Sequence, residues 1–207
     1  LAASEKLEKD ALPFNIRAIL ALERAQAAGH MTTNKDRFSL FSLYFNIQQF
    51  AKAAELMESG LRSGTMDDEQ RNWEMLSYCY QQINMELKSV EVLKKAASHF
   101  PKSGQLYLQV ANNYYMLDKV PEAYENAKLS VQKGGLDQPY KAHYFIAFLA
   151  FEMRKFDEAL VAIDKAIALM PKDKPEAQYP QLREAINAGL EDQKRIRTAV
   201  ENQRRIR

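Results

Sequence analysis

The feature that most constrains this chain is the spacing of its helix-breaking residues. Gly and Pro are rare, with seven of each in 207 residues, and most fall in clusters about 35 residues apart, the interval expected of two-helix repeats. Between the clusters, apolar residues recur at three- and four-residue spacing, and no stretch alternates convincingly with period two. The clusters are Gly29; Gly60 and Gly64; Pro101 and Gly104; Gly134, Gly135 and Pro139; and Pro171 and Pro175. The pattern predicts an all-α fold.

Aligning the chain on itself gives columns of similar residues separated by 36, 34 and 36 positions. Small residues are expected where two helix backbones approach closely, and larger ones where neighbouring repeats meet. The columns with larger side chains are Leu40, Leu76, Val110 and Ile146; Tyr44, Tyr80, Tyr114 and Ala150; and Met57, Leu93, Ala127 and Ile163. The small columns are Ala53, Ser89, Ala123 and Ala159, and Gly60, Ala96, Ser130 and Ala166.

Residues 34 to 173 resemble the tetratricopeptide-repeat (TPR) family. The best unit begins Trp73-x-x-Leu76-Ser77-x-x-Tyr80, which matches the family's first-helix signature except for Ser77, where Gly is usual. The last unit closely matches the family's second helix from Phe156 to Pro171, and the other two units match less well. The resemblance implies a right-handed α-solenoid of TPR helix hairpins.

The expected organisation is a single solenoid domain over residues 1–207. Its parts are a partial N-terminal repeat (1–33), four repeats (34–69, 70–103, 104–139 and 140–173) and a C-terminal capping helix (174–207). Residues 13–28 are expected to form the second helix of the partial repeat, with Pro13 in its first turn and Ala18, Leu22 and Ala25 on its packing face. The polar final helix is expected to cover the open end of the solenoid.

The chain carries little sign of chemistry beyond binding. The sequence contains no Gly-rich phosphate loop and no nucleophile elbow, and none of His30, His99 and His143 has another ligand residue at metal-binding spacing. We therefore expect no catalysis, cofactor or metal. The single Cys79 lies in an apolar helical stretch and is expected to be a buried small residue. The longest uncharged apolar stretch is too short to span a membrane, so direct membrane insertion is not expected.

Nucleic-acid binding is also not expected. The net charge is only +2, and the basic residues that gather near the C-terminus have no aromatic residue among them to stack a base. A solvated helix with basic residues at its C-terminal end explains the cluster better than an anionic partner does. The basic residues are Lys194, Arg195, Arg197, Arg204, Arg205 and Arg207, against Glu201 alone.

The TPR resemblance places one face of each first helix in a concave groove. Carried over residue by residue, the predicted peptide-binding groove is Phe38, Phe45, Tyr78, Leu108, Asn112, Tyr115, Met116, Tyr144, Phe148 and Phe151. Large apolar side chains are unusual on a surface that faces only water. The family's clamp for a terminal carboxylate is missing, with only Asn112 agreeing, so a partner that presents an apolar helix or extended segment suits the groove better.

Two functions follow as hypotheses. The first is a non-catalytic scaffold or adaptor that binds a protein or peptide in the groove. The alternative is a structural self-association module in which the terminal helix or groove pairs with a second copy, giving a homo-oligomer. The aromatic residues could also be covered by neighbouring side chains, by residues 1–12 or by a second copy.

A finer resemblance concerns the compartment. The stretches Asp68 to Tyr80 and Val131 to Leu136 resemble the periplasmic TPR proteins that accompany TonB–ExbB–ExbD systems in Gram-negative bacteria. This implies a periplasmic location and a role in assisting an envelope transport complex, with the cytoplasm as the alternative. The chain begins at Leu1 without a basic and then apolar leader, so we expect that a targeting segment has been removed or that the chain is part of a longer one.

Overall fold

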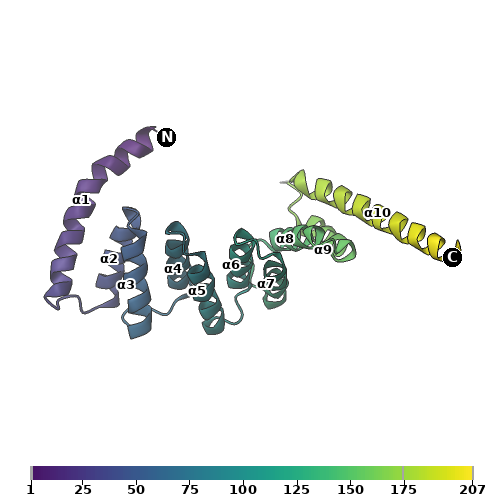
Figure 1. The fold of residues 1–207 in the computed structure, drawn as a ribbon. Coiled ribbons are helices and arrows are strands. Elements are labelled where there is room, and N and C mark those ends of the chain that lie inside the picture. Colours follow the sequence, from purple (N-terminus) through teal and green to yellow (C-terminus); the bar gives the residue numbers. More distant parts are fainter. Residues whose placement is uncertain (1, 174, 207) are drawn as a thin grey trace. The chain divides into compact units, whose positions relative to one another are not determined.

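The computed structural model describes the backbone of residues 2–173 and 175–206 and the side chains of residues 11–173 and 175–203. Over this part of the chain all regular structure is α-helical, and no strand is present (Figure 1). The helices are α1 (Ala2–Ala27), α2 (Asn34–Asn46), α3 (Phe50–Ser63), α4 (Gln70–Gln82), α5 (Glu86–His99), α6 (Gly104–Met116), α7 (Val120–Lys133), α8 (Pro139–Glu152), α9 (Phe156–Leu169) and α10 (Gln178–Ile206). The all-α prediction is confirmed, with breaks near Gly64, Pro101, Gly135 and Pro171 as expected.

The chain forms two compact units, Leu1–Ala96 and Ala97–Arg207. In the first unit α2 packs against α3 and α3 against α4, and α1 lies against α2. In the second unit α6 pairs with α7 and α8 with α9, and α10 packs on α9 (Figure 1). That residues 1–207 make one solenoid domain stays a prediction.

The helices of each hairpin are joined by the same tight turn. In the first hairpin the amide of Gln49 donates to the carbonyl of Tyr44 at 2.8 Å, and the amide of Gln48 donates to the carbonyl of Phe45 at 3.0 Å. This pair of bonds defines a Schellman motif, which needs one residue in the left-handed region. All four hairpins contain such a residue, with φ between 56° and 60°: Gln48, Asn84, Asp118 and Arg154.

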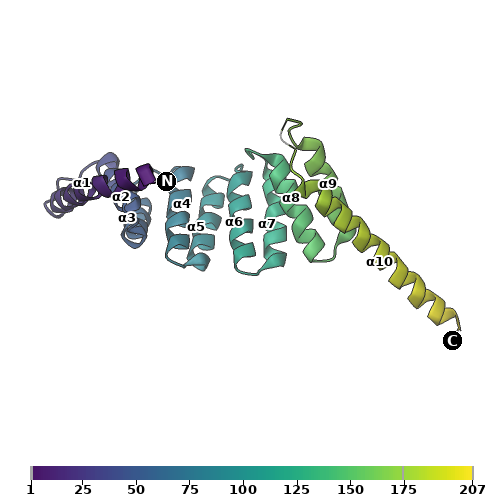
Figure 2. The same ribbon diagram turned by 90° about the horizontal axis from the view of Figure 1, so that it is seen from above.

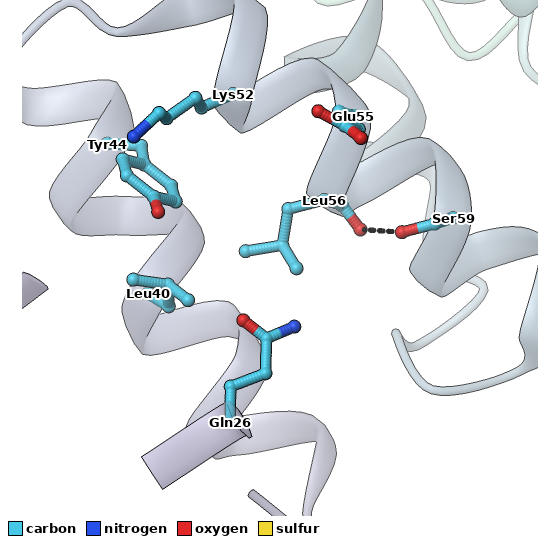
Figure 3. Close-up of a pocket in the computed structure, with 7 residues that line it drawn as sticks. All are labelled: Gln26, Leu40, Tyr44, Lys52, Glu55, Leu56 and Ser59. Carbon is cyan, nitrogen blue, oxygen red and sulfur yellow. Dashed lines mark hydrogen bonds between the residues drawn. The ribbon is translucent and has the colours of Figure 1, made fainter. Parts of the chain in front are cut away.

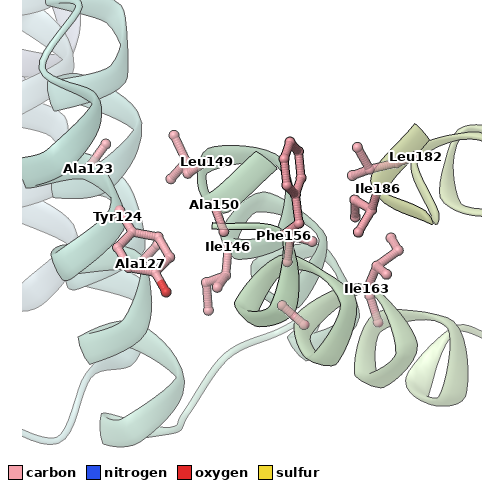
Figure 4. Close-up of a cluster of buried hydrophobic side chains, with 14 of the residues drawn as sticks. Ala123, Tyr124, Ala127, Ile146, Leu149, Ala150, Phe156, Ile163, Leu182 and Ile186 are labelled. Carbon is pink, nitrogen blue, oxygen red and sulfur yellow. The ribbon is translucent and has the colours of Figure 1, made fainter. Parts of the chain in front are cut away.

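The predicted columns form the core. Every residue of the five columns is buried except Tyr114, which is half-buried. In the second unit the core continues from α7 through α8 and α9 to α10, where Leu182 and Ile186 lie beside Phe156 and Ile163 (Figure 4). Within each unit, burial of these side chains holds neighbouring helices together.

Ser77, which departs from the family signature, is satisfied locally. Its hydroxyl lies 2.7 Å from the hydroxyl of Ser89, and both residues are buried between α4 and α5. The equivalent positions in the second unit are alanine pairs, Ala111 with Ala123 and Ala147 with Ala159, all buried. A hydroxyl pair and an alanine pair both fit because each leaves no buried polar group without a partner.

The helix α1 contacts α2 in the way that α3 contacts α4. The hydroxyl of Tyr44 donates to the carboxylate of Glu23 in α1, and the hydroxyl of Tyr80 donates to Glu58 in α3 at 2.8 Å. Since Glu23 and Glu58 are 35 residues apart, α1 occupies the place of a second helix. The packing-face residues Ala18, Leu22 and Ala25 are half-buried, whereas their equivalents Ala53, Met57 and Gly60 are buried.

The placement of Pro13 in the first turn of a helix is wrong. The helix α1 begins at Ala2, and Pro13 lies inside it. A proline inside a helix removes one backbone hydrogen bond and normally costs about 3 kcal/mol, but the backbone continues in helical form on both sides of Pro13.

Candidate interaction surface

In the first unit the structure brings the predicted groove residues of α2 and α4 together. The rings of Phe45 and Tyr78 have their centroids 5.6 Å apart. Phe38 joins them through Phe41, whose centroid lies 5.6 Å from Phe38 and 5.8 Å from Phe45. Phe38 and Phe45 are half-buried and Tyr78 is exposed. These aromatic side chains are therefore only partly accessible to a partner.

In the second unit the predicted residues lie on α6 and α8. The ring of Tyr115 meets that of Phe148 edge-on, at 5.6 Å and 79°, and also meets Phe145 at 5.8 Å and 90°. These edge-to-face contacts fix the ring orientations in the arrangement that aromatic pairs prefer. Asn112 and Met116 are exposed and Leu108 is half-buried. At 79% exposure, Met116 is the most exposed large apolar residue whose side chain the structure describes.

The other two aromatic residues on α8 turn to different neighbours. Tyr144 packs on Tyr179 of α10 with centroids 4.5 Å apart, and Phe151 packs on Phe156 of α9 at 5.8 Å. Both remain half-buried. We therefore define the α6–α8 surface as the predicted residues that keep exposed area in the second unit: Leu108, Asn112, Tyr115, Met116, Tyr144, Phe148 and Phe151.

The α6–α8 surface carries negative charge at one edge. The hydroxyl of Tyr115 donates to the Glu152 carboxylate at 3.3 Å. Burial raises the pKa of Tyr115, and the neighbouring carboxylates of Glu152 and Asp118 raise it further. The phenol therefore stays protonated at neutral pH and keeps donating, which holds its ring in place.

Tyr140 and Tyr179, which are not among the predicted groove residues, also belong to this region. Tyr140 and Tyr144 both pack on Tyr179, which is fully buried and whose hydroxyl has no hydrogen-bond partner. A sequence signal for Tyr179 did exist, because it follows the predicted groove residue Tyr144 by 35 residues, which is the period of the repeats.

A separate depression lies between α1, α2 and α3 in the first unit (Figure 3). Its volume is about 270 Å³, and its lining residues are Gln26, Leu40, Tyr44, Lys52, Glu55, Leu56 and Ser59. The Lys52 ammonium lies 5.3 Å from the Tyr44 ring centre and 3.5 Å from Glu23, so this ammonium already has partners. This volume is below that of ordinary cofactor sites, so the depression does not indicate a cofactor.

Over the described residues, no cluster of His, Cys, Asp and Glu could hold a metal ion. Cys79 is buried as expected, and burial raises the pKa of its thiol to about 12, which keeps it unreactive. No described helix combines the length and apolar character needed to cross a bilayer.

The basic C-terminal segment is solvated where the structure describes it. Lys194, Arg195 and Arg197 are exposed on α10, and Arg197 pairs with Glu201 at 3.2 Å. The described part of the chain does not include the side chains of Arg204, Arg205 and Arg207. It also does not include the side chains of residues 1–10, which belong to a candidate cover for the groove.

Comparison with known proteins identifies the fold. No protein-family model matches the sequence, and no curated protein matches it. The structure is similar to the C-terminal part of a TPR repeat-containing protein from Cytophaga hutchinsonii, with a TM-score of 0.68 and 12% identity over 91% of this chain and 72% of that one. It is also similar to MamA, with a TM-score of 0.59 and 16% identity over 73% of this chain and 85% of that one.

A third similar structure is YrrB, described as a TPR protein with an unusual peptide-binding site. Its TM-score is 0.59, with 16% identity over 79% of this chain and 81% of that one. At these identities the likeness concerns the fold. This chain therefore has the fold of the tetratricopeptide-repeat α-solenoids.

Proposed function

We propose that this protein is a non-catalytic interaction module that binds a protein or peptide segment on the α6–α8 surface. The observation that carries the proposal is the exposure of Met116, which follows Tyr115 on α6, together with the edge-to-face pair of Tyr115 and Phe148. A large apolar side chain that is left mostly in water, on a surface that also carries aromatic rings, is typical of a binding site. The similarity to a peptide-binding TPR protein supports the same function.

The surface offers two kinds of contact to a partner. Tyr115 and Phe148 supply rigid apolar area, which loses little conformational entropy on binding because the rings already pack on one another. Asn112 is exposed on α6 and can bond to the backbone of an extended or helical segment. Most of the affinity is expected from the apolar contacts, so the binding should depend only weakly on salt.

The experiment is capture of a partner by the immobilised chain, followed by binding measurements on alanine variants. Tyr115→Ala or Phe148→Ala should weaken binding by about 2 kcal/mol or more, which is roughly thirtyfold. Tyr107→Ala is the matched control, because this half-buried tyrosine of α6 packs near Lys133, away from Tyr115 and Phe148. Equal affinity for all three variants and the original chain would contradict the proposal.

The second candidate function is self-association, and the observation in its favour is exposed apolar area on α1, at Leu12, Ile16 and Leu20. Sedimentation at several concentrations tests self-association, and a chain that stays monomeric across the micromolar range would contradict it. Both functions can also coexist, because α1 and the α6–α8 surface belong to different units.

We further propose a periplasmic location and a role in assisting an envelope transport complex. The support is the resemblance of Asp68 to Tyr80 and Val131 to Leu136 to the TPR proteins that accompany TonB–ExbB–ExbD systems. Cell fractionation of the tagged protein tests the compartment, and co-purification of ExbB or ExbD tests the role. Recovery in the cytoplasmic fraction would favour the alternative compartment.

A further inference from the structure

Met116 occupies a position at which the other repeats carry a polar residue. It is the last residue of α6, and the last residues of α2, α4 and α8 are its equivalents in the repeats. These equivalents are Asn46, Gln82 and Glu152, and all four side chains are exposed. An amide or a carboxylate is accommodated at this position in three hairpins, so the hairpin of α6 does not need an apolar side chain there.

The eight methionines of the chain differ widely in their exposure. Met116 is 79% exposed and Met85 is 44% exposed. Three further methionines are half-buried and three are buried, which are Met75, Met153 and Met170, and Met31, Met57 and Met66, respectively. An oxidant in solution must reach the sulfur atom to react, so we expect Met116 to be oxidised first.

Oxidation by a peroxide would give Met116 the polarity of its equivalents. A sulfur lone pair attacks one oxygen of hydrogen peroxide, an S–O bond forms as the O–O bond breaks, and the second oxygen leaves as water after proton transfer. The sulfur loses two electrons and the peroxide gains them. The sulfoxide is polar and accepts hydrogen bonds, as the side chains of Gln82 and Glu152 do, and methionine sulfoxide reductases reverse the reaction.

We propose that Met116 is a modification site, at which oxidation by hydrogen peroxide reversibly switches off partner binding on the α6–α8 surface. The switch rests on the function proposed above for that surface. Met116 follows Tyr115, whose ring meets that of Phe148 edge-on at 5.6 Å, so a sulfoxide puts a polar group at the end of an apolar surface. A partner that covers this group without bonding to it binds less tightly.

The same exposure means that oxidation should leave the fold intact. The Met116 side chain lies mostly in water, and its equivalents are polar in the other three hairpins. Oxidation of a buried methionine, such as Met57, would instead place a polar group in the core. The switch therefore acts on binding and not on folding.

The chain provides its own controls for this reaction. The thiol of Cys79 is fully buried, and burial raises its pKa to about 12, so it does not compete for the peroxide. Met85 is the second most exposed methionine, but it lies in the first unit and outside the α6–α8 surface. Oxidation of Met85 should therefore have no effect on binding at that surface.

The first test is peptide mapping by mass spectrometry of the folded full chain during a titration with hydrogen peroxide. Met116 should be oxidised first and Met85 second, and the buried Met31, Met57 and Met66 should react only when the chain is unfolded. Circular dichroism and thermal unfolding of the chain oxidised at Met116 should match those of the untreated chain. If Met116 reacts no faster than the half-buried methionines, the proposal is overturned.

The second test measures binding before and after peroxide treatment. The probe is a methionine-free peptide, selected from a random phage-displayed library on the untreated chain and labelled for fluorescence anisotropy. Oxidation should raise its dissociation constant at least about fivefold, and methionine sulfoxide reductases should restore it. Met116→Leu should abolish the response to peroxide, whatever its starting affinity, whereas Met85→Leu should leave the full response.

Phe148→Ala separates the switch from the proposed function. If this variant binds the peptide as tightly as the original chain, the proposed function fails and the switch fails with it. If Phe148→Ala weakens binding and oxidation does not, only the switch is overturned. A response that persists in Met116→Leu would assign the effect to another methionine, such as the half-buried Met153, and would also overturn the proposal.

Discussion

The two terminal helices bury their apolar side chains in opposite ways. The first half of α10 places Tyr179, Leu182 and Ile186 in the core of the second unit, and from residue 191 to 203 every side chain of α10 is exposed. Both views show α10 running well past α8 and α9 (Figures 1 and 2). In α1, by contrast, Ile19 is buried while Leu12, Phe14, Ile16 and Leu20 are exposed.

The difference shows what makes a terminal helix a cap. A cap presents an apolar side to the last repeat and a polar side to water. The helix α10 does so, and Gly189 allows it to approach α9 closely, since a Cβ atom there would lie 2.5 Å from the Phe156 ring. The helix α1 presents apolar side chains on both sides, so it contacts α2 without closing the first unit.

Removing the cap should have the largest effect. A chain lacking residues 174–207 would expose Phe156 and Ile163, which α10 helps to bury. We expect this chain to aggregate or to unfold its α8–α9 hairpin, as seen by gel filtration and hydrogen exchange. The matched control lacks only residues 191–207 and should keep full stability. If both truncated chains behave alike, α10 is not a cap.

Single substitutions at two isoleucines test the buried and the exposed half of α10 separately. Ile186 is fully buried, whereas Ile196 is 59% exposed. Ile186→Ala should lower the free energy of unfolding by about 2–5 kcal/mol because it leaves a cavity. Ile196→Ala should change it by less than about 0.5 kcal/mol. Urea unfolding of the two variants measures both, and similar losses would contradict the division of α10.

Two alanine-to-leucine substitutions compare the packing of α1 with that of a complete hairpin. Ala159 and Ala18 occupy the same small-residue column, but Ala159 is fully buried and Ala18 only half-buried. Ala159→Leu should destabilise by about 1–3 kcal/mol because the added carbons have no room. Ala18→Leu should stay within about 0.5 kcal/mol. An unchanged melting temperature for Ala159→Leu would defeat the close-packing interpretation.

The terminal helices also differ in their polar contacts. The Tyr44 hydroxyl donates to Glu23 of α1, while the Tyr179 hydroxyl in α10 is buried without a partner. Tyr44→Phe should therefore destabilise by about 1 kcal/mol, and Tyr179→Phe should be neutral or stabilising. Thermal unfolding gives both values. A destabilised Tyr179→Phe variant would instead indicate a buried water bonded to Tyr179.

The smallest expected effect is the pH dependence of the Tyr44 contact. The hydrogen bond from Tyr44, followed by the nearby charge of Lys52, lowers the pKa of Glu23 below its ordinary value of 4.5. A carboxylate with a lowered folded-state pKa contributes stability above its unfolded pKa, and the contribution is lost as the pH falls through the folded value. The difference between Tyr44→Phe and the original chain should therefore shrink below about pH 4. A difference that stays constant in acid would show that Glu23 is not the acceptor.

The repeat columns could be predicted because packing sets both their period and their residue sizes. Ala53, Ala123 and Ala159 had to be small for two helices to meet, and all three are fully buried. The hairpin turns were harder to predict. Asn84 and Asp118 are residue types that tolerate the left-handed region, but Gln48 and Arg154 carry no such signal, and the geometry of the hairpin forces them into it.

The sequence by itself determined that the chain is a set of helix hairpins, that the predicted groove side of every first helix carries at least one aromatic residue, and that Cys79 is buried. Helical periodicity is local, so it assigns residues to a side of a helix. The tertiary structure decided how much of each aromatic residue stays exposed, because Tyr144 and Phe151 are partly covered through contacts with Tyr179 and Phe156 on other helices. It also decided that Pro13 lies inside α1 and that Leu12, Ile16 and Leu20 remain in solvent, because burial depends on which neighbouring helix is present.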